Sequence, residues 1–84
     1  MMAVYLEKRD PDKRQARFYR IRVSQTLFGS WAMIREWGRI GSAGTVRETW
    51  YDSKTEALDA GEKLLAQKTK RGYQHVGLPY AFLG

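Results

Sequence analysis

The sequence predicts an α+β fold, in which one curved antiparallel β-sheet of four to five strands has a single α-helix packed across it. Four segments within the first 52 residues show strand-like patterns and are separated by short turn-forming stretches. Residues 53–72 then change to the period of a helix. Because the connections between the strands are short, consecutive strands are expected to pair as an antiparallel meander.

The first two strands are expected at residues 2–10, "MAVYLEKRD", and at residues 16–24, "ARFYRIRVS". A turn-forming cluster that contains Pro11 separates them. The second segment alternates strictly, so that its two faces differ in character. One face has Tyr19, Ile21 and Val23, and the other has Phe18, Arg20 and Arg22. The first of these faces is therefore expected in the core.

Residues 31–40, "WAMIREWGRI", and residues 45–52, "TVRETWYD", predict the next two strands, joined by the tight loop "GSAG". Gly38, Gly41 and Gly44 suggest a phosphate-binding loop, but their spacing is G-x-x-G-x-x-G and no G-K-[ST] follows. The loop also does not open directly onto a helix. Turn geometry between two strands explains these glycines better, because glycine adopts positive φ without strain.

Residues 53–72, "SKTEALDAGEKLLAQKTKRG", predict an amphipathic helix that lies across the sheet. Ser53 and Glu56 form a capping box at its start, and Gly72 follows a basic last turn as a stop signal. The stripe that is expected to face the sheet consists of Ala57, Leu58, Gly61, Leu64 and Leu65. The small residues in this stripe allow close approach to the strands.

One domain is expected over residues 1–84, because a chain of 84 residues can build only one small core. The body of this domain extends over about residues 3–73, and an apolar C-terminal tail follows at residues 74–84, "QHVGLPYAFLG". The tail is too apolar for a free end. We expect it to dock on the body of the domain or on a partner protein.

Composition restricts the possible functions. Fifteen Lys and Arg against nine Asp and Glu leave a net charge of +6, which favours an anionic partner, although solubility alone also accounts for a basic surface. The absence of cysteine excludes disulfides and thiolate metal sites. With no secretion signal and no apolar run near the roughly 20 residues of a membrane span, we expect a cytoplasmic protein without a membrane partner.

Catalytic chemistry finds no support in the sequence. His75 is the only histidine, and no second metal ligand or nucleophile lies at a useful spacing from it. The carboxylates Asp59 and Glu62 fall on the outer face of the predicted helix, where solubility explains them. We therefore expect no active site, no metal and no cofactor.

The segment "REWGRIG" contains the first candidate binding residues. Trp37 and Arg39 are two residues apart in a predicted strand, so they share a face with Arg35, while Ile34 and Ile40 point the other way. If the isoleucines enter the core, the tryptophan and the arginines lie together outside, where the ring stacks on a sugar or base and the guanidinium groups bind phosphate. The alternative is that Trp37 caps one end of the core.

Further basic residues are candidates whose role depends on their distance from Trp37. Lys68, Lys70 and Arg71, with Tyr73, place positive charge at the end of the predicted helix, where the helix dipole also favours it. Arg20 and Arg22 form either a solvated sheet face or a platform for nucleic acid.

Several of these segments together resemble the WGR domain family. They are "WGRIG" at residues 37–41, Gly44, "SKTEA" at the helix start and "KTKRGY" at residues 68–73. The resemblance extends from about residue 3 to Tyr73. WGR domains accompany the catalytic region of DNA-dependent poly(ADP-ribose) polymerases, occur in some bacterial regulators of molybdate metabolism, and exist as short free-standing bacterial proteins. This chain is most similar to the free-standing kind.

The resemblance implies DNA binding. In the polymerases the motif tryptophan lies against a sugar near a strand end, and the arginine links DNA to neighbouring domains; Trp37, Gly38 and Arg39 match these positions. Because no catalytic, zinc-finger or helical domain is expected here, only the binding role transfers. The sequence thus predicts a non-catalytic module that contacts DNA phosphate and sugar, with strand ends or nicks as candidate ligands. The alternative is a protein interaction adaptor that uses Trp37 and the apolar tail.

Overall fold

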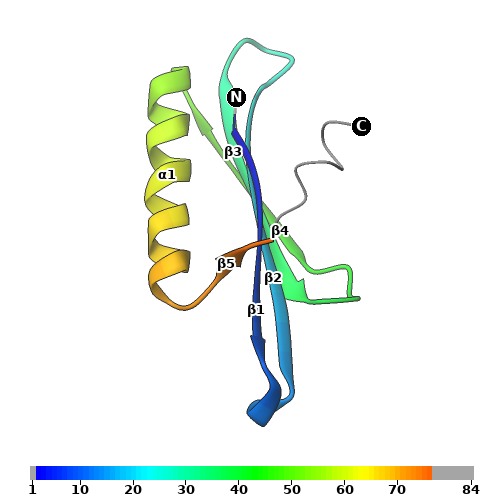
Figure 1. Cartoon of the computed structure of the whole chain (residues 1–84). Helices are drawn as coiled ribbons and strands as arrows, with labels where there is room; N and C mark the ends of the chain where they lie inside the picture. Colours follow the sequence, from blue (N-terminus) through cyan, green and yellow to red (C-terminus); the bar gives the residue numbers. More distant parts are fainter. Residues whose placement is uncertain (1, 77–84) are drawn as a thin grey trace, which may run out of the picture.

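The computed structural model describes residues 2–76, which form one five-stranded antiparallel sheet and one long helix (Figure 1). The strands are β1 (Met2–Asp10), β2 (Gln15–Gln25), β3 (Trp31–Arg39), β4 (Thr45–Tyr51) and β5 (Gln74–His75). A short 3-10 turn, η1 (Pro11–Lys13), joins β1 to β2, and the helix α1 extends over Lys54–Lys70. The predicted α+β class is confirmed.

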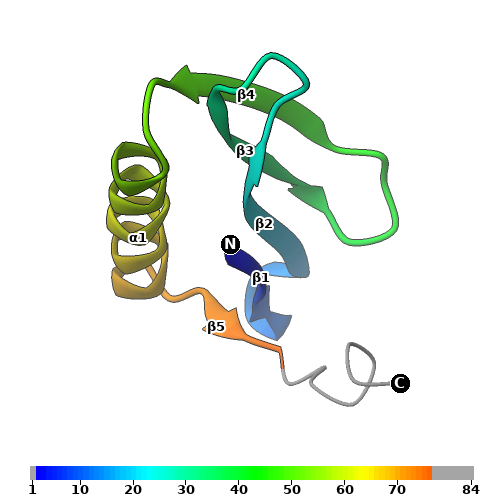
Figure 2. The ribbon, with the colours of Figure 1, turned by 90° about the horizontal axis from the view of Figure 1, so that it is seen from above.

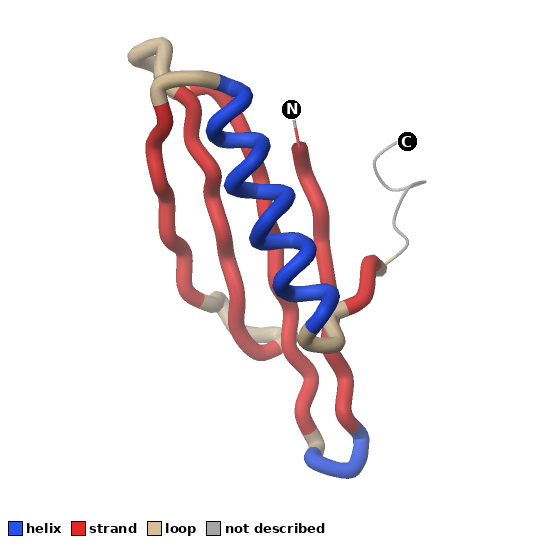
Figure 3. Tube along the Cα trace, turned by 90° about the vertical axis from the view of Figure 1, so that its left-hand side faces the viewer, coloured by secondary structure: helices blue, strands red, loops and turns tan. Residues whose placement is uncertain are grey.

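The sheet has the order β4-β3-β2-β1-β5, so the first four strands form the expected meander and β5 returns to the far edge beside β1. The helix α1 lies on one face of this twisted sheet and crosses it diagonally (Figures 2 and 3). We call this face the helix side, and the opposite face of the sheet the open face. All strand pairs are antiparallel. Strands β4 and β5 form the two edges of the sheet, and each of them pairs with one neighbour, β3 and β1 respectively.

The core lies between α1 and the helix side of the three middle strands. Its buried cluster contains Leu6, Tyr19, Ile21, Val23, Met33, Ala57 and Leu64. The alternation that was predicted for β2 is therefore correct, since Tyr19, Ile21 and Val23 face the helix. Leu58 and Leu65 are partly buried and pack against this cluster.

The helix begins and ends where the sequence signals indicate. The Ser53 hydroxyl accepts a hydrogen bond from the Glu56 amide at 3.2 Å, which satisfies one of the free amides of the first turn. At the other end Gly72 has φ +101°. A Cβ on Gly61 would lie 2.9 Å from the Met2 sulfur and 3.3 Å from Val23 Cγ2, so the helix approaches the sheet as closely as a glycine permits.

Strand β3 places Trp37 on the helix side. Its register with β2 pairs Tyr19 with Trp37, Ile21 with Arg35 and Val23 with Met33. Directly opposed residues of an antiparallel pair project from the same face, so Trp37 and Arg35 share the face of the core while Ile34 lies on the open face. The condition that Ile34 enters the core is thus not met. Trp37 instead packs against the core and stays partly exposed.

The β3–β4 hairpin explains the glycines next to Trp37. Gly41 and Gly44 have φ values of +94° and +78°, as turn geometry requires. At Gly38 the reason is different, because a Cβ there would lie 2.8 Å from the Cα of Gly44. Gly44 in turn lies against the Phe18 ring on the open face, where a Cβ would approach Cζ to 2.8 Å. The glycines let the hairpin fold tightly over Phe18.

The start of the C-terminal tail returns to the sheet. Residues Gln74 and His75 pair with Glu7 and Leu6 of β1, and the Val76 amide donates to the Tyr5 carbonyl at 3.2 Å. Residues 74–76 therefore dock on the body of the domain, as expected for the tail. The remainder of that prediction concerns residues 77–84, which lie outside the described part of the chain.

Candidate nucleic-acid interface

A corner on the helix side, near the C-terminal end of α1, combines aromatic rings with uncompensated positive charge. Three rings, Trp37, Tyr19 and Tyr73, form a row from β3 across β2 to the segment that follows α1. Five cations surround this row. They are Lys8, Arg17, Arg35, Arg39 and Lys68. We call these eight residues the Trp37 corner.

The aromatic row is held by direct ring contacts. Trp37 stacks on Tyr19 with ring centroids 5.8 Å apart and an interplanar angle of 14°. Tyr19 meets the edge of Tyr73, also with centroids 5.8 Å apart. Because Tyr19 is buried in the core, its ring fixes the position of Trp37, while Trp37 itself remains partly exposed. The fold thus fixes the tryptophan and leaves part of its ring accessible.

Three of the cations lie against the faces of these rings. Lys68 Nζ is 4.7 Å from the centroid of the Tyr19 ring, Arg35 Cζ is 5.4 Å from that of Trp37, and Lys8 Nζ is 5.9 Å from that of Tyr73. A cation within about 6 Å of an aromatic face is attracted by the ring quadrupole. The rings therefore hold these cations near one another without neutralising them.

Arg17 and Arg39 complete the corner at the next row of the sheet. The register pairs Lys8 with Arg17 and Arg17 with Arg39, so these residues form a row of cations directly below the row that contains Tyr19 and Trp37. Both arginines are exposed. Like charges that face each other across strands destabilise a sheet, which means that stability does not explain this row.

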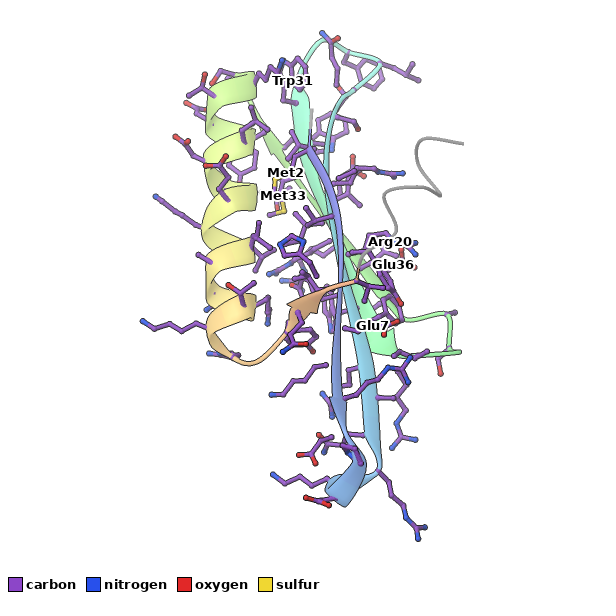
Figure 4. All side chains as sticks on the ribbon, viewed as in Figure 1. Met2, Glu7, Arg20, Trp31, Met33 and Glu36 are labelled. Atoms are coloured by element: carbon purple, nitrogen blue, oxygen red, sulfur yellow. The ribbon has the colours of Figure 1, made fainter. Side chains whose placement is uncertain are left out.

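The glutamates of the strands are separated from this corner. Glu7, Glu36 and Glu48 alternate onto the open face, where Glu7 and Glu36 project away from the helix with Arg20 (Figure 4). The two salt bridges found among residues 2–76, Arg9–Glu7 at 3.1 Å and Arg20–Glu36 at 3.2 Å, both lie on that face. The strands therefore have their glutamates on one face and the uncompensated cations of the Trp37 corner on the other.

The electrostatic effect is visible at Lys68. Burial lowers the pKa of its ammonium group, and the positive charges of Arg71, Arg35 and Lys8 lower that pKa further. Burial also raises the pKa of the Tyr19 hydroxyl, which Arg35 opposes. A site in which cations weaken one another's charged state gains from an incoming anion, because the anion relieves this repulsion.

Arg35 has a second unusual property. Its Nε atom is buried and has no hydrogen-bond partner among the described residues. Buried donors of this kind are normally satisfied, and the guanidinium group is a strong donor to carboxylate or phosphate oxygens. Arg35 also lines a groove of about 390 Å³ between α1 and strands β3 and β4.

The other candidate residues are distributed as follows. Arg20 and Arg22 lie on the open face, so the structure does not bring them together with Trp37. Arg71 caps the C-terminus of α1 and is close enough to Lys68 to affect its pKa. Lys70 is exposed, and its helical spacing from Lys68 places it on the opposite side of α1. Gly38 shapes the hairpin beside Trp37.

Sequence reasoning missed Lys8, Arg17 and Tyr19 as members of the corner. Alternation had placed Tyr19 on the core face, but the neighbour that it meets on β3 depends on strand register. Lys8 and Arg17 lie at strand ends near a turn, where exposed basic residues are common. Only the register of three strands aligns them with Arg39.

Within residues 2–76 no cluster of three or more His, Asp or Glu side chains has the geometry of a metal site. The helix found in this part of the chain is also not long and apolar enough to cross a membrane.

Comparisons with known proteins place this arrangement in context. The sequence profile of the WGR domain matches residues 2–78. The chain is also 37% identical over 71 residues to y4dW, a protein of Sinorhizobium fredii (strain NBRC 101917 / NGR234) whose function is uncharacterised. That alignment covers 84% of this chain and 35% of the relative, so the chain spans about a third of the relative's length. No solved structure matches significantly.

Proposed function

Since this chain belongs to the WGR domain family, a small non-catalytic domain of the nucleic-acid-binding type, we propose that it binds DNA through phosphate and sugar contacts with little sequence specificity. The proposal rests on one observation, the Trp37 corner. There a partly exposed tryptophan is fixed on a buried tyrosine and surrounded by cations without a carboxylate partner among the described residues. Trp37, Gly38 and Arg39 are also the positions that match the family motif.

The chemistry of the corner suits a nucleic-acid backbone. Arginine and lysine side chains bind phosphate, and an aromatic face stacks on a sugar or base. The positive charges that lower the pKa of Lys68 favour an incoming anion. In this proposal Arg39, Arg17 and Lys8 contact phosphates, Trp37 contacts a sugar or base with the part of its ring that stays exposed, and Arg35 lies against the same ring at 5.4 Å from its centroid. Lys68, Arg71 and Tyr73 flank the same ligand.

Low sequence specificity follows from the shape of the site. A helix that reads sequence must enter the major groove, and α1 instead packs across one face of the sheet. Side chains that pair bidentately with adenine, Asn and Gln, do not occur among the residues of the corner. Backbone contacts position a protein on DNA without reading its sequence.

Strand ends and nicks are the expected DNA structures. Inside a duplex each base is stacked on both sides, whereas an end or a nick leaves a sugar and a base face free for Trp37. The proposal needs no metal or cofactor, involves no enzymatic activity, and places the protein in the cytoplasm of a bacterium. Arg20, Arg22 and Lys70 remain outside this contact.

The test is a titration of labelled blunt, nicked and single-stranded DNA at two salt concentrations, monitored by fluorescence anisotropy. We expect Trp37→Ala to weaken binding to nicked or blunt DNA by about 1–3 kcal/mol, the usual contribution of one stacked base. The matched control is Trp50→Ala, which removes an exposed tryptophan from the open face of β4. Equal affinities of wild type and both variants, with circular dichroism showing folded protein, would exclude the corner as a DNA site.

The competing proposal is a protein interaction adaptor that uses Trp37 and the tail. An adaptor surface is expected to be apolar, and the surroundings of Trp37 are cationic. The adaptor is favoured if every corner variant still binds DNA and if a partner protein is captured by the wild type but not by Trp37→Ala.

A further inference from the structure

A second surface, the free edge of the sheet at β4, has features that DNA binding does not use. Strand β4 is the outer strand of the sheet beyond β3, and every residue from Thr45 to Trp50 is exposed. An exposed edge strand presents unpaired amides and carbonyls that another extended chain can pair with. The question is which kind of chain this edge fits.

The hydrogen-bonding pattern identifies the free backbone groups. Ile40 N donates to Ala16 O at 3.0 Å, so the even-numbered residues of β3 face β2 and its odd-numbered residues face β4. Trp37 pairs with Thr45 and Arg35 with Arg47, so the backbone amides and carbonyls of the odd-numbered residues of β4 point toward β3. The amides and carbonyls of Val46, Glu48 and Trp50 therefore point outward, away from the sheet.

The two faces of this edge differ in chemistry. On the helix side Arg47 lies beside Arg35, and the groove of about 390 Å³ behind them is also lined by Lys63. No carboxylate lines this groove. A strand added beside β4 would direct alternate side chains over Arg47 toward these cations, so acidic residues fit there.

On the open face the same edge is mostly apolar, with Glu48 between Val46 and Trp50. Val46 and Trp50 are 60% and 51% exposed, and the Phe28 ring lies 6.1 Å from that of Trp50. Phe28, Leu27 and Trp50 line a second groove of about 280 Å³ between β4 and the β2–β3 loop. The remaining side chains of an added strand would point to this face, so apolar residues fit there.

We propose that the β4 edge binds an extended peptide of a partner protein that alternates acidic and apolar residues, which adds to the sheet as a sixth strand. The backbone groups of Val46, Glu48 and Trp50 give the pairing, and the two unlike faces give the specificity. This inference goes beyond DNA binding and does not depend on it, because its backbone contacts come from the outward side of β4; Arg35 is the residue that the two surfaces share.

A second copy of the chain fits this edge less well. In symmetric antiparallel pairing centred on the middle of β4, either Arg47 opposes Arg47 or Glu48 opposes Glu48, and like charges directly opposite destabilise a strand pair. The net charge of +6 adds repulsion between copies. An acidic partner has neither disadvantage.

Two peptides separate strand pairing from charge attraction. A fluorescein-labelled ten-residue peptide that alternates Glu and Val is titrated by anisotropy beside a control in which the same residues form one block of Glu and one of Val. The alternating peptide is expected to bind at least about tenfold tighter, since only it matches both faces. Equal affinities would overturn the proposal.

Protein variants test the backbone contact. Glu48→Pro removes an outward amide and leaves the β3–β4 hydrogen bonds intact, whereas Glu48→Ala removes the same carboxylate but keeps the amide. We expect Glu48→Pro to bind the alternating peptide about tenfold more weakly than Glu48→Ala. If Glu48→Pro does not fold, a peptide with N-methylated amides at alternate positions tests the same pairing in the wild-type protein. Equal binding in this comparison would contradict the proposal.

Charge and self-association complete the design. Arg47→Gln is expected to lower the affinity for the alternating peptide by about fivefold. Arg22→Gln makes the same change in charge on the open face and is expected to leave this affinity unchanged. Self-association is measured by light scattering. If the wild type is a dimer and Glu48→Pro is a monomer, the edge binds a second copy and the proposal is overturned. Glu48→Pro should bind DNA as wild type does, and Arg39→Gln should bind the peptide as wild type does, so failure of either proposal is distinguishable from failure of the other.

Discussion

Trp37 serves the core and the candidate site at once. Its ring stacks on Tyr19, which is 3% exposed, and this contact sets the position of the tryptophan before any ligand arrives. Arg35 covers another part of the ring at 5.4 Å and keeps its buried Nε without a partner. A fixed aromatic side chain loses little conformational entropy on binding, which favours affinity.

Lys68 gives the corner a pH dependence that can be measured. Its pKa is lowered from 10.5 by burial and by three neighbouring cations, and a bound phosphate would favour the charged form. DNA binding is therefore expected at full strength below the pKa of Lys68 in the free protein and to weaken as the pH rises through it. The loss should begin at a lower pH than an ordinary lysine would give.

The measurement is the affinity for nicked DNA from neutral to alkaline pH in Lys68→Arg, where the charge persists. We expect this variant to lose the early decline that wild type shows. Lys70→Arg is the control, since Lys70 is exposed on the other side of α1. Identical pH profiles for wild type and Lys68→Arg would show that Lys68 does not contact the DNA.

Among the elements, strand β3 shows how far the sequence determines this fold. Most element boundaries agree with the sequence prediction to within one or two residues, because β2 alternates strictly and α1 has clear start and stop signals. Strand β3 has apolar and charged residues on both faces, so alternation could not decide which face of Trp37 meets the core. Register with β2 decides it.

The same reasoning explains the two remaining differences. Strand β5 has only two residues, too few for any periodicity. The sequence grouped Arg20 and Arg22 with Trp37 by charge, and the alternation of β2 already placed them opposite Tyr19. Only the pairing of β2 with β3 reveals that Trp37 shares the face of Tyr19, so that Arg20 and Arg22 lie on the opposite face from Trp37 as well.

The β3–β4 hairpin offers a test of how the motif glycines act. Alanine at Gly41 meets no atom within 4 Å and suffers only from its positive φ, a cost of about 1–2 kcal/mol. Alanine at Gly44 has the same φ problem and also meets Trp37 O at 2.7 Å and Phe18 Cζ at 2.8 Å. Overpacking of this kind costs about 1–3 kcal/mol more.

Urea unfolding of Gly44→Ala and Gly41→Ala measures the difference between these costs. We expect Gly44→Ala to have the lower free energy of unfolding. If the two variants are equally stable, the close approach of Gly44 to Trp37 and Phe18 does not constrain the hairpin.

At the scale of the whole molecule, the sheet separates charge between its faces. The helix side has Lys8, Arg17 and Arg39 in one row, and the open face has the three strand glutamates and both salt bridges of the described residues. A net charge of +6 alone would attract DNA to any part of the surface. The proposed function requires that the helix side near Trp37 makes the contact.

Two double variants with the same change in net charge distinguish these possibilities. Arg17→Gln/Arg39→Gln removes two exposed cations from the helix side, and Arg9→Gln/Arg22→Gln removes two exposed cations from the open face. The measurement is the salt dependence of the affinity for nicked DNA. We expect the slope of log K against log[salt] to fall by about 1.8 in the helix-side variant, since each lost phosphate contact removes about 0.9, and to stay unchanged in the open-face variant. Equal changes of slope in the two variants would contradict a DNA site at the Trp37 corner.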